Sequence, residues 1–146
     1  MNSSSQYLVD QAIKSLAEGD SLVALIHLEN AHKADPSPRA KSLLAYCLAK
    51  ERRQFQKARQ LCQEALHLDP NNPEHYCQLG RICLLAHQKR QAIQTFRKGL
   101  KLGRYQPIID ELRALGLRKS PVFESLGREH FLNRSAGKFL SRIGNR

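Results

Sequence analysis

The sequence predicts an all-α protein, an α-solenoid of three helix–turn–helix repeats followed by a capping helix and a basic tail. Small residues recur at a strict spacing of 34, at Ala24, Ala58 and Ala92. Apolar residues make up 41% of the chain and aromatic residues only 6%, and Leu, Ala and Ile predominate. This composition favours closely packed helices over a sheet. The 146 residues suffice for one compact domain or a short stack of repeats.

The spacing of 34 extends to further positions of the same units. Leu28, Cys62 and Phe96 follow it, as do the Asp-Pro pairs at 35–36 and 69–70. Two antiparallel helices cross closely where small side chains lie at the contact, and the next pair repeats that contact to bury its open face. Each Pro is expected to end the second helix of its unit.

The pattern defines the expected helices and their grouping. Helices are predicted over residues 4–17, 21–34, 38–51, 55–68, 73–86 and 89–102, in repeats 5–37, 38–72 and 73–106. One residue is inserted within 50–55, which we assign to the turn between helices. Residues 107–116 are the predicted capping helix, with Pro107 in its first turn and Gly116 at its end. Residues 117–146 form an extension that is both basic and apolar.

The third unit carries a family resemblance. Tyr76, Leu79-Gly80 and Cys83 occupy its first helix, and Ala92, Phe96 and Gly99 its second. This pattern resembles the tetratricopeptide repeat family, and the resemblance covers residues 5–106. The chain end also looks like those of small bacterial repeat proteins of unassigned function. The family resemblance implies a protein–protein interaction scaffold, or adaptor, which binds a peptide or helix of its partner in a concave groove.

The same resemblance implies which side chains line that groove. They are Asp10, Ser42, Tyr46, Lys50, Gln78 and Arg81, together with Val9, Ile13, Cys77 and Leu84. Tyr46 and Arg81 are the predicted partner contacts, because Tyr offers a flat apolar body with a polar tip and Arg a fork for carboxylates. The alternative is that Tyr46 only packs between helices and Arg81 is only solvated.

Some members of the family clamp the carboxylate of a peptide with Lys and Asn. Here Val9, Ile13 and Ser42 hold those positions, so the resemblance implies an acidic or mixed peptide rather than a chaperone tail.

The charge of the chain is uneven. The net charge is +11, yet residues 1–38 carry two basic and five acidic residues, and no acidic residue lies between Glu74 and Asp110. Arg90, Arg97, Lys101 and Arg104 are spaced to share one helix face. This basic face indicates an anionic partner, which is an acidic protein segment, nucleic acid or an anionic membrane surface. The alternative is a solvated face that prevents end-to-end stacking of repeats.

Other functional classes have little support in the sequence. It contains no phosphate loop, nucleophile elbow or zinc-protease motif, so we predict no enzyme and no cofactor. His75, Cys77 and Cys83 match no standard zinc spacing, so no metal is expected. No secretory signal or membrane span is seen, and a cytoplasmic location is expected. Membrane contact through 119–146 ranks last, because three glycines weaken a helix there.

Two functions therefore remain. The first is an adaptor that binds a protein or peptide in the groove. The alternative is a module associated with nucleic acid or an anionic surface through its basic face and tail, although few aromatic residues are present to stack bases.

Overall fold

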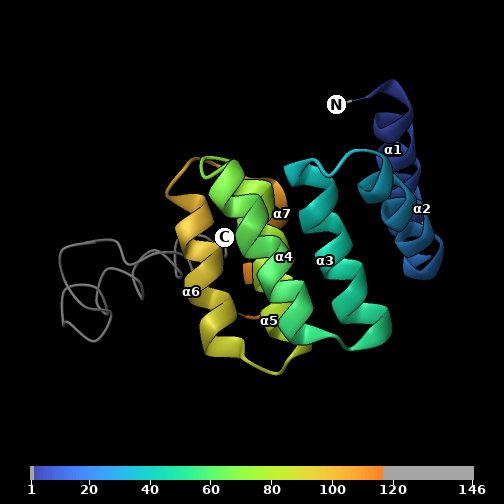
Figure 1. Ribbon diagram of the computed structural model, residues 1–146. Helices are drawn as coiled ribbons and strands as arrows, with labels where there is room; N and C mark the ends of the chain where they lie inside the picture. Colours follow the sequence, from blue (N-terminus) through green and yellow to red (C-terminus); the bar gives the residue numbers. More distant parts are fainter. Residues whose placement is uncertain (1, 117–146) are drawn as a thin grey trace, which may run out of the picture. The chain divides into compact units, whose positions relative to one another are not determined.

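The computed structural model describes residues 2–116, which form seven α-helices and no strand (Figure 1). All seven helices begin and end within two residues of the predicted positions. The chain divides into two units, Met1–Leu112 and Arg113–Arg146, and the packing below is that of the first. The helices are α1 (Ser3–Ala17), α2 (Ser21–Ala34), α3 (Pro38–Arg52), α4 (Phe55–Leu68), α5 (Pro73–Leu85), α6 (Lys89–Leu100) and α7 (Gln106–Ala114).

The helices pack as successive hairpins. α1 lies against α2, α3 against α4 and α5 against α6, while α2 packs on α3 and both α3 and α4 pack on α5. One buried apolar cluster joins α1, α2 and α3, and a second joins α3, α4 and α5. Because α3 contributes to both clusters, the hairpins form a continuous stack. The predicted all-α solenoid of helical repeats is confirmed.

Small residues allow the close crossings. Ala24, Ala58 and Ala92 have no exposed surface. Gly80 of α5 faces the fully buried ring of Phe96 on α6, and a Cβ added to Gly80 would lie 2.7 Å from the ring Cζ. The spacing of 34 therefore marks helix contacts, as predicted from the sequence.

The helix starts follow local capping chemistry. The side chains of Asp20, Ser37 and Asn72 accept hydrogen bonds from backbone N–H groups in the first turns of α2, α3 and α5. These bonds satisfy donors that lack a partner within the helix. Gln54 and Gln88, before α4 and α6, make no such bond.

The turns inside the three hairpins share one backbone conformation. Gly19, Arg53 and His87, each 34 residues from the next, have positive φ values of 85°, 56° and 59°. The turn after α3 is one residue shorter than the other two, and α3 itself extends to Arg52. The inserted residue is thus taken up at the end of α3, and its predicted place in the turn is wrong. A helix absorbs an extra residue by continuing its hydrogen-bond ladder.

α7 approaches the end of α6 through Ile108. Ile108 is fully buried, and a Cβ added to Gly99 would lie 2.6 Å from its Cδ1. After α7, Gly116 has a φ of 70° and donates its N–H to the Arg113 carbonyl. The repeat boundaries within 5–106 and the capping role of 107–116 stay predictions. The extension 117–146 lies outside the described residues.

Candidate functional site

Tyr46 lies close to two cations, one on its own helix and one on α5. Its ring, on α3, is half-buried, with Lys50 Nζ 5.8 Å and Arg81 Cζ 5.7 Å from the ring centroid. Lys50 follows Tyr46 by one helical turn, whereas Arg81 comes from α5. Both cations lie within the range of cation–π attraction. Three of the six predicted partner residues are therefore brought together.

Arg81 is also held by an acidic side chain. Its Nε lies 2.6 Å from Oε1 of Glu111 on α7, and the two side chains are 30% and 25% exposed. We call Tyr46, Lys50, Arg81 and Glu111 the Tyr46 cluster. A second ion pair joins α3 to α5 nearby, between Arg39 Nε and Glu74 Oε2 at 3.0 Å. Arg81 is thus neither free nor merely solvated.

The other three predicted residues do not join this cluster at the surface. Ser42 is fully buried, and Gln78 is only 4% exposed. The Gln78 Oε1 atom has no hydrogen-bond donor among the described residues. Asp10 is exposed on α1, where its carboxylate accepts a hydrogen bond from Gln6. Ser42 and Gln78 lie where α5 packs on α3, so they contribute to helix packing.

Ser42 belongs to a buried polar network that the sequence did not reveal. Its Oγ lies 2.8 Å from Nδ1 of His75, whose Nε2 lies 3.3 Å from Oδ2 of Asp69. Burial lowers the pKa of His75. Neutral His75 can donate from Nε2 to Asp69 and accept at Nδ1 from Ser42. The residue types are those of a hydrolase triad, but Ser42 and His75 have no exposed surface and thus offer no nucleophile to a substrate.

The four cysteines are buried thiols. Burial raises the pKa of Cys47 and Cys62 to about 12 and that of Cys77 to about 11, and it also raises the pKa of Cys83. Such thiols behave as small apolar side chains. Among residues 2–116, no three His, Cys, Asp or Glu side chains converge on a common point.

The predicted basic face is exposed but shorter than expected. Arg90 and Arg97 lie on α6, and Lys101 caps its end. Arg104 lies beyond Gly103, whose φ of 144° takes the chain out of helical geometry. Arg104 instead contacts Gln106, with a distance of 3.5 Å between Nη2 and Oε1. Arg90, Arg97 and Lys101 therefore share one helix face, and Arg104 does not belong to it.

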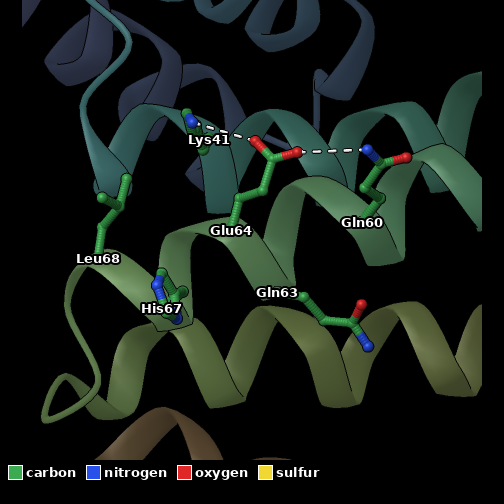
Figure 2. Close-up of a pocket in the computed structure, with 6 residues that line it drawn as sticks. All are labelled: Lys41, Gln60, Gln63, Glu64, His67 and Leu68. Carbon is green, nitrogen blue, oxygen red and sulfur yellow. Dashed lines mark hydrogen bonds and ion pairs between the residues drawn. The ribbon is translucent and has the colours of Figure 1, made fainter.

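One hollow lies elsewhere, along α4. It measures about 400 Å³ and is lined by Lys41, Gln60, Gln63, Glu64, His67 and Leu68 (Figure 2). Lys41 Nζ and Glu64 Oε2 are 3.1 Å apart, and this hydrogen bond lowers the pKa of Glu64. None of the predicted partner residues lines the hollow. Because Lys41 and Glu64 neutralise each other, this pair leaves no net charge in the hollow.

Part of the repeated hairpin structure matches a known protein family. Residues 61–94 match the family described as "Tetratricopeptide repeat". The chain therefore contains a tetratricopeptide repeat (TPR). No curated protein sequence matches it significantly.

Solved structures share the fold of this TPR protein. The first TPR domain of the human RPAP3 protein is 19% identical with a TM-score of 0.62, and the match covers 77% of this chain and 90% of that one. The first TPR of Spaghetti (RPAP3), bound to the HSP90 peptide SRMEEVD, is 19% identical with a TM-score of 0.60 and the same coverage. The Sgt2 TPR domain from Aspergillus fumigatus is 16% identical with a TM-score of 0.58, over 91% of this chain and 95% of that one.

Within the described part of the TPR protein, no helix is long and apolar enough to cross a membrane.

The sequence did not reveal three interactions in and around the site. They are Arg81–Glu111, Arg39–Glu74 and Ser42–His75. Each joins residues about 30 or more positions apart, so helical spacing within one element could not reveal it. One signal was present for Glu111, because Asp110 and Glu111 are the first acidic residues after the acid-free interval.

Proposed function

We propose that this TPR protein is an adaptor that binds a segment of a partner protein over the Tyr46 cluster. The observation that carries the proposal is the half-buried ring of Tyr46 with Lys50 and Arg81 5.8 and 5.7 Å from its centroid. Tyr and Arg are enriched among the residues that contribute most to protein interfaces. A ring already fixed by its neighbours also loses little side-chain entropy when a partner binds.

The charges of the cluster favour a partner segment with at least one carboxylate. Lys50 is exposed and makes no ion pair with a described residue. Among the described residues, Arg81 is paired with Glu111 alone, so the cluster keeps a net positive charge. A carboxylate of the partner near Tyr46 would approach two cations at once.

The comparison with solved structures supports this class of function. The first TPR of Spaghetti (RPAP3) holds an HSP90 peptide, SRMEEVD, which contains three acidic residues. At 19% identity this likeness supports the fold and not the same ligand. Val9 and Ser42, at two of the expected clamp positions, are fully buried, so we propose contacts centred on Tyr46 instead.

Capture of partners from a nuclease-treated native lysate tests the proposal. The wild-type protein is immobilised beside Tyr46→Leu, which keeps apolar volume, and Lys50→Glu, which reverses an exposed charge. We expect a protein retained by the wild type to bind each variant at least about tenfold more weakly, as for a residue central to an interface. The matched control is Arg90→Gln with Arg97→Gln, which changes α6 and should retain the partner.

Circular dichroism of each variant tests whether it is folded. Equal retention by the wild type, Tyr46→Leu and Lys50→Glu would show that the Tyr46 cluster is not the binding site. Absence of any retained protein from the nuclease-treated lysate would count against the adaptor function itself.

A further inference from the structure

The solvent face of α6 carries only one sign of charge. Five cations are exposed along it, which are Lys89, Arg90, Arg97, Lys98 and Lys101, and we call them the α6 ridge. None of the five makes an ion pair with a described residue. From this ridge we infer a second binding surface, which contacts the phosphate backbone of duplex nucleic acid.

Helix stability explains only part of the ridge, because the helix dipole favours Arg97 and Lys98 in the last turn of α6. Arg97 and Lys101 lie four residues apart, where like charges repel on a helix surface. Lys89 and Arg90 lie in the first turn, where the helix dipole disfavours cations. That turn also lacks a side-chain cap, because Gln88 makes no capping bond. A polyanion bound along α6 would relieve each of these unfavourable interactions.

The residues between the cations indicate which polyanion fits. The exposed positions within the ridge are Gln91 and Gln94, and no aromatic side chain is exposed on α6. Interfaces with proteins usually have aromatic and apolar anchors at their centre and are depleted in Lys. Single-stranded nucleic acid is held by stacking on aromatic rings. A ridge of Lys, Arg and Gln alone suits duplex phosphates, which need charge and hydrogen-bond donors but no stacking.

The length of the ridge is compatible with such contacts. From Arg90 to Lys101 a helix rises about 16 Å, at roughly 1.5 Å per residue. One strand of a duplex places a phosphate about every 3.4 Å along the axis, so the ridge spans about five base pairs. Contacts made only with phosphates predict binding without sequence preference. This surface is independent of the Tyr46 cluster and of the adaptor function.

Salt-dependent binding of the full chain to duplex DNA tests the inference. A fluorescent duplex of about 20 base pairs and mixed sequence is titrated at about 50 and 200 mM salt, and anisotropy gives the Kd. Phosphate contacts from all five ridge cations predict that affinity falls about 500-fold between the two salt concentrations. Removing two of them, by Arg90→Gln with Arg97→Gln, should reduce that fall to about 40-fold. The matched control, Lys14→Gln with Lys33→Gln, removes the same charge from α1 and α2 and should behave as the wild type.

Three outcomes would overturn the inference. One is no binding of the duplex at the lower salt. Another is equal effects of the two double variants, which would place any binding outside α6, including in the basic extension. The third is tighter binding of a polyglutamate peptide than of the duplex to the ridge. That result would identify an acidic protein as the ligand. Circular dichroism of each variant excludes loss of folding as the cause.

Discussion

Arg81 of α5 and Glu111 of α7 form an ion pair, with 2.6 Å between Nε and Oε1. The same guanidinium lies 5.7 Å from the ring centroid of Tyr46 on α3. One arginine thus connects three helices. In the proposed complex, the Glu111 carboxylate holds the guanidinium that a carboxylate of the partner would approach. Glu111 is then an internal competitor of the partner.

Replacement of Glu111→Gln should strengthen partner binding. It removes the competing charge but keeps a hydrogen-bonding side chain of the same size. A partly exposed ion pair contributes about 0.2–1 kcal/mol, so we expect Kd to fall by a factor of about 1.4 to 5. Calorimetric titration with the captured partner segment measures it, with Glu18→Gln, at the C-terminal cap of α1, as a control of equal charge. Weaker binding by Glu111→Gln would instead assign Glu111 to direct contact with the partner.

The contact between Gly80 and Phe96 predicts a loss of stability when Gly80 gains a side chain. Gly80→Ala would place a Cβ 2.7 Å from the ring Cζ of a fully buried Phe96. Overpacking of this kind costs about 1–3 kcal/mol in the free energy of unfolding. Urea denaturation should show it, and Phe96→Leu combined with Gly80→Ala should cost less than the two single changes together. Strict additivity of the two changes would contradict the contact.

The left-handed turns predict opposite effects at equivalent positions. His87 has a φ of 59° and Gly19 a φ of 85°. A residue with a Cβ is strained in this region, whereas glycine is not. We expect His87→Gly to raise the free energy of unfolding by about 0.5–1 kcal/mol and Gly19→Ala to lower it by at least as much. Thermal unfolding of both variants measures this, and a stabilised Gly19→Ala would rule out the assigned turn conformation.

The buried network around His75 predicts that stability falls in acid. Burial lowers the pKa of His75 in the folded state below its ordinary value of 6.5. As the pH falls below 6.5, the unfolded chain binds a proton that the folded chain does not, so acid favours unfolding. The slope reaches at most about 1.4 kcal/mol per pH unit for one such group.

Urea denaturation at several pH values between 7.5 and 5 measures this slope. His75→Gln should make the dependence shallower. A remaining slope is expected from His32, whose pKa burial also lowers. An unchanged pH dependence in His75→Gln would show that His75 does not contribute to it.

The helices could be predicted from the sequence because their signals are local. The Asp-Pro pairs at 35–36 and 69–70 mark the ends of second helices, and the alanines spaced 34 apart mark the crossings. The inserted residue was misplaced, since a one-residue shift between Ala45 and Ala58 fits either a longer helix or a longer turn. Only hydrogen bonding in the folded chain decides between them.

The candidate site could be predicted only in part. Tyr46, Lys50 and Arg81 came together because the repeat places them at related helix positions. Ser42 and Gln78 are on the same helices, but their exposure depends on how closely α5 approaches α3. Helix spacing gives the direction of a side chain and not the distance to the next helix, so their burial could not be read from the pattern.

The most direct test of the adaptor function is a map of the surface that the captured partner segment contacts. Chemical-shift changes in ¹⁵N-labelled protein, recorded as the segment is added, locate that surface residue by residue. We predict that the largest changes fall on α3 and α5 around Tyr46, Lys50 and Arg81, and that the α6 ridge stays unchanged. Changes confined to α6 or to α1 and α2, with none around Tyr46, would contradict the proposed site.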